Sequence, residues 1–489
     1  MKRLTLIITM LFTGFVLING QTKPDDIDIN DAIQDEFMFD HAVNNNKVDV
    51  TVTNGIVELT GEVNNLKAKE RATKIAELVK GVRSVSNRIE VDPSVYLSDV
   101  VIQDKVEEAL LDDPATDLFE IGVNVDEKVV TLTGTVDSYQ EKQLVADVAK
   151  SVKGVTGLEN EVDVNYKENR TDYEIKNEIR AGLKWNEMID DGMIRVAVDN
   201  GNVDLIGSVS SAAEKTNAMH TSWVAGVTSV DVSDLKVEWW LEDEDLRKYK
   251  DKNVSDAEIE QAILDAAIYD PRVNSFDITV DADMAWVTLR GNVDNLTAKK
   301  AAEMLAENTY GVKGVTNRIR VKTDDVEDSE VQANINEALS ENAITEAWDI
   351  GVFVENGVAT LAGRVDSYLE KAEAEWVASN AEGVNEVNNV LEISYPYGYY
   401  WYGNYPYYDL FITRPVDVYA IPDDGRIKAE VSREIWWSPY VDRDQVQINV
   451  ENGVVSLEGT VDSYREYREA AENAWEGGAY AVDNELVIK

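Results

Sequence analysis

Side chains that commonly carry out catalysis are scarce in this chain of 489 residues. It has no cysteine, which excludes thiol catalysis, disulfides and a lipid-modified cysteine anchor. Its two histidines, His41 and His220, lie in non-equivalent sequence contexts, so neither a histidine metal site nor a serine–histidine pair is predicted. Phosphate-binding, dinucleotide-binding and nucleophile-elbow motifs are absent from the sequence. We therefore predict that the protein is not an enzyme and that it uses no cofactor and no metal.

Carboxylates are the most abundant ionisable groups, with 93 Asp and Glu against 46 Lys and Arg and a formal net charge of −47. The acidic clusters Asp190-Asp191, Glu242 to Asp245 and Asp423-Asp424 lack the ligand spacing of a calcium-binding loop. Solvated surface charge is the expected role of these clusters, and weak calcium binding stays open. Because such a charge repels phosphate backbones, nucleic acid is not expected as a partner.

One aromatic segment is a candidate binding site. Between residues 395 and 408 the chain has eight tyrosines and one tryptophan, and no charged residue. Tyr and Trp combine a flat apolar ring with a polar group, which suits contacts with sugars, proteins or lipid head groups. The alternative is a linker that packs on its neighbours. The candidate binding residues are Tyr395, Tyr397, Tyr399, Tyr400, Trp401, Tyr402, Tyr405, Tyr407 and Tyr408.

A repeated pattern supplies the scaffold for these residues. Six times, a valine-rich strand runs into a glycine and is followed by a polar helix start, an amphipathic helix and a second valine-rich strand. The clearest copies read VTLTGTVDSYQEK, ATLAGRVDSYLEK and VSLEGTVDSYREY. A backbone role is expected for the repeated glycine, and close approach to a ligand is the alternative. The six glycines are Gly61, Gly134, Gly207, Gly291, Gly363 and Gly459.

Each copy predicts the order α-β-β-α-β. In the second copy a helical apolar spacing precedes the alternating run Ile121 to Val125, which predicts a helix and then a strand. Four copies place Asn-Gly between the two strands, which indicates a hairpin turn. Ser138 and Glu141 fit a capping box at the start of the second helix. The closing strand contains an asparagine in five copies (Asn87, Asn160, Asn317, Asn389 and Asn484).

This order, the strand running into a fixed glycine and the closing segment G-V-x-x-V-x-N resemble the BON domain family. The resemblance implies an α+β fold: a tandem array of six small α-β-β-α-β domains. It implies no catalytic residues, and attachment to phospholipid surfaces or assistance to envelope protein folding as roles. We place the domains at residues 27–94, 98–165, 171–238, 254–322, 328–394 and 425–489. A charged linker is expected at residues 239–253 and a tyrosine-rich linker at residues 395–424.

The six copies are interpreted as a duplicated set of three. The first and fourth share Asn-Leu-x-Ala-Lys, the second and fifth share Val-Asp-Ser-Tyr, and the third and sixth have tryptophan at the end of the first helix, at Trp185 and at Trp436-Trp437. Convergent drift is the alternative. Because the linker at residues 239–253 is strongly charged, it is expected to be extended, so that the two sets of three can move relative to one another.

Residues 1–21 resemble a secretory signal peptide, with Lys2 and Arg3 before an apolar run of residues 4 to 17. The expected location is therefore the periplasm. The predicted function is non-enzymatic binding of envelope or unfolded proteins under stress. The alternative is an adaptor at the envelope surface that binds phospholipid or cell-wall glycan through these domains and the tyrosine-rich segment.

Overall fold

The computed structural model describes residues 24–40, 42–43, 47–116, 119–167, 170–242, 254–273, 276–323, 326–345, 349–393 and 424–489. Within these ranges the chain forms six small α+β domains, each with two helices and one mixed sheet of three or four strands. None of the helices in the described ranges has the length and apolar character needed to cross a membrane.

The first domain shows the common architecture. It consists of α1 (Asp26–Phe39), β1 (Val48–Thr53), β2 (Ile56–Val63), α2 (Leu66–Leu78) and β3 (Ser84–Asn87), which β4 (Glu90–Val91) extends. Strand β1 pairs with β2 antiparallel, and β3 and β4 pair with β2 in parallel after the crossover through α2. The central strand β2 therefore joins a hairpin to a β-α-β unit.

The other five domains repeat this order. The second domain consists of α3 (Asp99–Asp112), β5 (Ile121–Asp126), β6 (Val129–Val136), α4 (Tyr139–Ser151), β7 (Gly157–Asn160) and β8 (Asp163–Val164). The third consists of α5 (Asp172–Trp185), β9 (Ile194–Asp199), β10 (Asn202–Val209), α6 (Ala212–Thr221), β11 (Ser229–Asp231) and β12 (Leu235–Val237). The fourth consists of α7 (Asp256–Tyr269), β13 (Ile278–Asp283), β14 (Trp286–Val293), α8 (Leu296–Glu307) and β15 (Gly314–Val321). The fifth consists of α9 (Asp328–Glu341), β16 (Ile350–Glu355), β17 (Val358–Val365), α10 (Tyr368–Asn380), β18 (Glu386–Asn389) and β19 (Glu392–Ile393). The sixth consists of α11 (Asp424–Trp437), β20 (Val446–Glu451), β21 (Val454–Val461), α12 (Tyr464–Glu476) and β22 (Ala481–Ile488).

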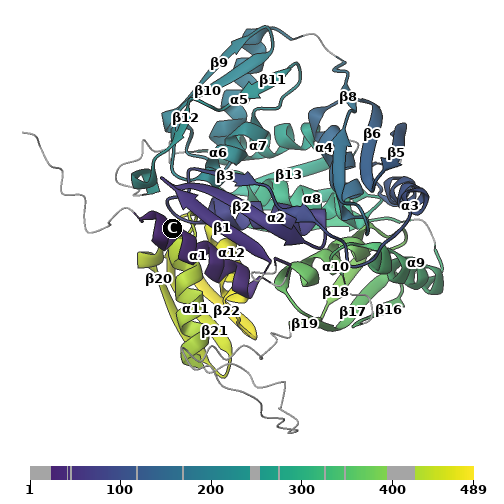
Figure 1. Cartoon of the computed structure of the whole chain (residues 1–489). Helices are drawn as coiled ribbons and strands as arrows, with labels where there is room; N and C mark the ends of the chain where they lie inside the picture. Colours follow the sequence, from purple (N-terminus) through teal and green to yellow (C-terminus); the bar gives the residue numbers. More distant parts are fainter. Residues whose placement is uncertain are drawn as a thin grey trace, which may run out of the picture.

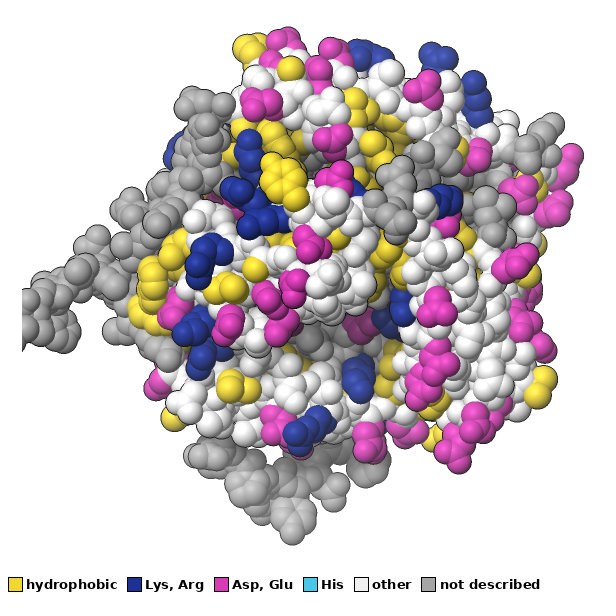
Figure 2. Space-filling model, turned by 90° about the horizontal axis from the view of Figure 1, so that it is seen from above, with side chains coloured by type: hydrophobic (Ala, Val, Ile, Leu, Met, Phe, Trp, Pro, Cys, Tyr) yellow, Lys and Arg dark blue, Asp and Glu magenta, His cyan; other side chains and the backbone are white. Residues whose placement is uncertain are grey.

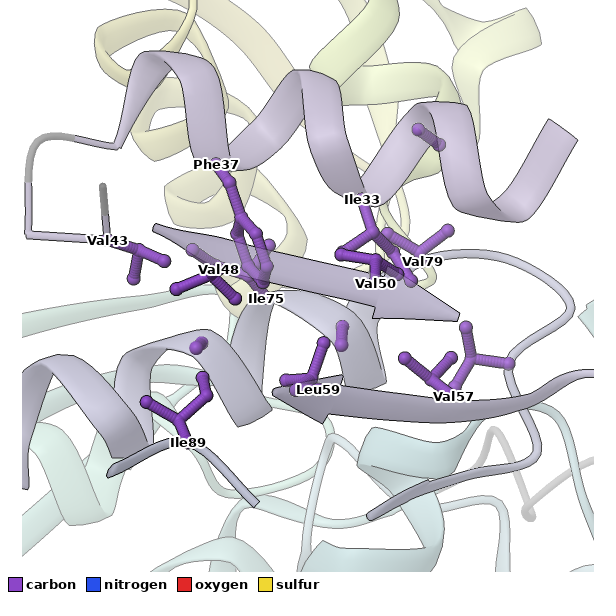
Figure 3. Close-up of a cluster of buried hydrophobic side chains, with 14 of the residues drawn as sticks. Ile33, Phe37, Val43, Val48, Val50, Val57, Leu59, Ile75, Val79 and Ile89 are labelled. Carbon is purple, nitrogen blue, oxygen red and sulfur yellow. The ribbon is translucent and has the colours of Figure 1, made fainter. Parts of the chain in front are cut away.

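Both helices of a domain cover the same face of its sheet. In the first domain Val48 and Val50 of β1 are buried, whereas the alternate residues of that strand are exposed. Figure 3 shows Ile33 and Phe37 of α1 pointing onto these valines and onto Leu59 of β2. The apolar spacing of the helices and the alternation of the strands thus produce one two-layer core per domain.

An aspartate at the start of each first helix holds the hairpin turn. The Asp26 carboxylate accepts hydrogen bonds from the backbone N–H groups of Asn54 at 2.7 Å and Gly55 at 2.9 Å. This contact recurs in all six domains, although sequence reasoning did not single it out. The equivalent residues are Asp99, Asp172, Asp256, Asp328 and Asp424.

Steric crowding explains why glycine recurs at this position. All six glycines have φ between 112° and 148°, a region that residues with a Cβ rarely adopt. A Cβ on Gly61 would lie 1.9 Å from the carbonyl oxygen of Lys47, which precedes the paired strand β1. The glycine lies inside the central strand, and β6, for example, continues past Gly134 to Val136. Its local role is therefore to let two strands approach closely.

The serine and glutamate at the start of the second helix form hydrogen bonds that differ in one partner from the predicted capping box. The Ser138 hydroxyl accepts a hydrogen bond from the Glu141 backbone N–H, as expected, but the Glu141 carboxylate accepts one from Asp137, the residue before the cap. The asparagine of the closing strand fixes that strand to the second helix. Asn87 donates to the Lys69 carbonyl oxygen at 2.7 Å.

The first three domains form one block, in which each domain contacts the other two through its second helix or the residues just after it. Leu66, at the start of α2, packs into the core of the second domain, and Ala212, at the start of α6, packs into the core of the first. The second and third domains meet where the ring of Tyr139 stacks on Trp223 with centroids 4.1 Å apart. The second helices gather toward the middle of the molecule, and most sheets lie at its periphery (Figure 1).

The last three domains form a second block with contacts at equivalent positions. Leu296, equivalent to Leu66, packs into the core of the fifth domain. In block one the Thr216 hydroxyl donates to Glu77 at 2.9 Å, and at the equivalent positions of block two Arg468 pairs with Glu307 at 2.7 Å. These shared contact positions match the interpretation of the chain as a duplicated set of three.

The two blocks are packed against each other, so the expectation that they move independently is wrong for the described residues. Trp185 of the third domain packs on the core of the fourth, and at the equivalent end of its helix Trp437 of the sixth packs on the core of the first. The second and fifth domains share backbone hydrogen bonds, including one from Ala343 to Ser151 at 2.8 Å. The linker expected to be extended begins as a 3₁₀ helix, Trp239–Glu242, with Leu241 buried.

The hairpin turn of the fourth domain offers a first test. Met284 and Ala285 adopt positive φ, where four other domains have Asn-Gly. Replacing them with Asn and Gly should stabilise this domain by about 1 kcal/mol, because the left-handed conformation is strained for other residues. Hydrogen exchange of residues 254–323 in urea measures the effect. The reciprocal exchange of Asn356-Gly357 for Met-Ala should destabilise the fifth domain, and unchanged protection in both variants would contradict the steric argument.

The cross-block tryptophans offer a second test. The double variant Trp185→Ala and Trp437→Ala should lose about 2 to 5 kcal/mol of packing between the blocks, because two partly buried aromatic rings are removed. Small-angle scattering should then report a larger radius of gyration, with circular dichroism unchanged. Trp286→Ala, at a ring that is 59% exposed, is the control and should leave the radius unchanged. An unchanged radius in the double variant would mean that other contacts alone hold the blocks together.

Candidate functional site

The structure places the sequence-predicted residues unevenly. The nine aromatic candidates from Tyr395 to Tyr408 lie outside the described residues, as do residues 1–21 and His41. His220 lies near the end of α6, where burial lowers the pKa of its imidazole. Asp190 accepts a hydrogen bond from the Gly192 backbone N–H, and Asp424 holds a hairpin turn. These two acidic residues therefore have local structural partners.

The structure instead brings together a set of ionisable residues where the first, fifth and sixth domains meet. A small cavity of about 30 Å³ lies at this junction. The ionisable residues that line it come from five helices: α1 with the loop after it, α2, α10, α11 and α12. We call this set the carboxylate cluster: Glu36, Asp40, Arg71, Tyr368, Glu434 and Glu476.

Arg71 links the first and sixth domains within the cluster. Its guanidinium pairs with Asp40 of its own domain at 2.7 Å and with Glu476 of the sixth domain at 2.7 Å. The neighbouring Arg433 of α11 reaches back to Asp35 of α1 at 3.3 Å. Ion pairs therefore join α1 to α11 and α2 to α12 at this interface.

Glu36 and Glu434 face each other across this interface and share a hydrogen bond between their side chains. Glu434 is only 6% exposed. Burial raises the pKa of Glu36 to about 7, and burial together with the charge of Glu36 raises the pKa of Glu434 well above its usual range. A hydrogen bond between two carboxyl groups requires that one of them is protonated, which agrees with the raised pKa of both groups.

A third carboxyl group, in the sixth domain, also has a raised pKa. Glu469 on α12 is 7% exposed and pairs with Arg465, and burial raises the pKa of its carboxyl to about 7. Sequence reasoning missed all of these groups, because glutamates within polar helices are typical of exposed surfaces. In the described part of the chain, no three acidic or histidine side chains are arranged to hold a metal ion. The cluster can thus take up protons and hold domains together.

The raised pKa values predict how stability depends on pH. A carboxyl whose pKa is higher in the folded state stabilises the fold fully below its unfolded pKa, about 4.3, and this stability is lost as the pH rises through about 7. Glu434→Gln keeps a donor for Glu36 and removes a buried charge. It should raise the free energy of unfolding at pH 8 by about 1 to 3 kcal/mol, seen as a higher urea midpoint, and change it little at pH 5. The exposed Glu485→Gln is the control, and an equal response of both variants at the two pH values would contradict a shared proton.

Comparison with known proteins places these domains in a family. The chain is 33% identical over 148 residues to the osmotically-inducible protein Y of Escherichia coli strain K12, a match that covers 29% of this chain and 73% of that protein. Among solved structures, the C-terminal domain of CdsD, a structural protein of the type III secretion system of Chlamydia trachomatis, has 17% identity and a TM-score of 0.13, and covers 44% of this chain and all of that one. The periplasmic domain of PrgH has 10% identity and a TM-score of 0.12, and covers 42% and 98%. TM-scores this low establish no shared overall fold.

The family model of the BON domain matches the chain six times, at residues 25–93, 98–166, 171–238, 255–323, 327–395 and 423–489. Each match contains one of the six α-β-β-α-β units, with its repeated glycine and its aspartate-held turn. The chain therefore belongs to the BON domain family and contains six copies of the BON domain, which pack against one another.

Proposed function

We propose that this chain is a non-enzymatic periplasmic protein that binds unfolded envelope proteins under stress and limits their aggregation. The relative in Escherichia coli is named for osmotic induction, which supports a role in stress. The abundance of carboxylates supports solubility, and acidic side chains are scattered over the face seen in Figure 2 with Lys and Arg between them.

The free edge strands of the six sheets carry this proposal. In each sheet the first strand pairs along one side only, and in the described ranges no strand of a neighbouring domain continues any sheet. An edge strand offers unpaired backbone N–H and C=O groups, with which an extended polypeptide can pair. The six edge strands are β1, β5, β9, β13, β16 and β20.

Six such edges on one assembly favour long, unfolded clients over folded ones. A single added strand is a weak contact, but several contacts along one client chain raise the overall affinity without any tight site. A folded protein has already paired its own strands. The preferred clients are therefore unfolded chains with strand-forming sequences, such as β-barrel proteins of the outer membrane before insertion.

This proposal predicts suppression of aggregation. A urea-denatured outer-membrane β-barrel protein, diluted into buffer with the purified chain, should scatter less light as the chain approaches an equimolar ratio. Suppression should persist at 0.5 M salt, because backbone pairing is less sensitive to screening than charge attraction. Full aggregation at a severalfold excess of the chain would overturn the proposal.

A second function is proposed for the tyrosine-rich segment alone, namely attachment to phospholipid or cell-wall glycan. It is supported by the composition of residues 395–408. Deleting these residues should abolish co-sedimentation with liposomes or peptidoglycan and leave the melting temperature unchanged. If neither the full chain nor the deletion variant pellets at low or high salt, an adaptor role is excluded. A lower melting temperature after the deletion would indicate a packing role instead.

A further inference from the structure

A groove lies at the edge of the sheet in the sixth domain. It has a volume of about 380 Å³ and lies between helix α11 and the edge strand β20. This volume falls within the usual range of ligand-binding clefts, roughly 300 to 1,000 Å³. The half-buried Val446 and Ile448 supply its apolar surface, the buried Ile435 lies beneath it, and Lys428, Ser432 and Arg443 are among its polar residues.

In two of the other domains, the equivalent position of the first helix is tied to the backbone of the edge strand. In the first domain Asn30 of α1 donates to the carbonyl oxygen of Val50 in β1 at 2.8 Å. In the fourth domain Glu260, at the same position of α7, accepts from the Ala282 backbone N–H in β13 at 2.9 Å. These side chains tie the helix to the backbone of the edge strand. Lys428 occupies this position in α11 and, like Gln103, Lys176 and Gln332 in the second, third and fifth domains, makes no such bond to its edge strand among the described residues.

The two cations of the groove are available for a partner. Lys428 and Arg443 are both exposed, and neither has a carboxylate partner among the described residues. Asp442, next to Arg443, instead accepts hydrogen bonds from the Asp444 backbone and the Gln445 side chain. In a chain with twice as many acidic as basic residues, two exposed cations without a carboxylate partner among the described residues favour an anionic ligand in this groove.

We propose that this groove binds an extended peptide segment that has an acidic side chain between apolar ones. The segment pairs with the outward backbone groups of β20, its carboxylate lies between Lys428 and Arg443, and an apolar side chain contacts Val446 and Ile448. This inference rests on the proposed binding of unfolded clients and names the type of sequence that the sixth domain prefers.

The absence of cysteine allows a direct test in the full chain. Ser432→Cys introduces a single thiol into the groove. The probe is a fluorescein-labelled eight-residue peptide of alternating Val and Thr with one central Asp. It should slow alkylation of this thiol severalfold. The same peptide with Asn should protect the thiol less.

Charge variants separate groove binding from general attraction. Lys428→Glu combined with Arg443→Glu should weaken the binding of the Asp peptide, measured by fluorescence anisotropy, at least tenfold. Lys176→Glu changes the equivalent position of α5 in the third domain and serves as the matched control, with no expected change. Equal binding by the double variant and the wild type would overturn the proposal, as would stronger binding of the Asn peptide. A thiol that is unreactive without peptide would show that the chain itself fills the groove, which also overturns it.

The outcome is independent of the general function. If wild-type chain suppresses aggregation but does not bind the Asp peptide, only the groove assignment fails. If the peptide binds but aggregation is not suppressed, the groove is a peptide site in a protein with a different role.

Discussion

The packing of helices from different domains against one another is the interaction on which the rest of the structure depends. A domain of this size buries too little surface to be robust alone, and no disulfide reinforces it. Leu66 and Leu296 each complete the core of the following domain, and Trp185 and Trp437 each cover a core in the opposite block. Because the second helices gather toward the middle, most of the sheets lie at the periphery of the molecule.

The fold of each domain could be predicted from the sequence because it depends on local patterns. Alternating valines, Asn-Gly turns and a glycine with no room for a Cβ each constrain a few neighbouring residues, and six copies repeat the same constraints. The aspartate that holds the hairpin turn was also recoverable, since it stands at the same place in every copy. It was missed because an acidic residue at a helix start already has a sufficient local explanation, the helix dipole.

The arrangement of the domains and the carboxylate cluster could not be predicted in the same way. Equivalent contacts use unrelated chemistry, a Thr216–Glu77 hydrogen bond in one block and an Arg468–Glu307 ion pair in the other, so no shared motif marks them. Glu434 is a glutamate in a polar helix, and it is buried where the sixth domain meets α1, nearly four hundred residues earlier in the chain. Its pKa is thus a property of the assembly and has no counterpart in the local sequence.

Helix α11 joins the two unusual features of the sixth domain. Lys428, Ser432 and Ile435 line the groove beside β20, while Arg433 and Glu434 of the same helix contact the first domain. A helix moves as a rigid unit, so a tilt that widened the groove would also shift the carboxyl group of Glu434 relative to Glu36. Burial is the main cause of the raised pKa of both groups, so water that entered between them would lower the pKa of each and weaken proton binding at the junction. Peptide occupancy of the groove and protonation of the junction therefore act on the same element, at the contact between the first and last domains of the chain.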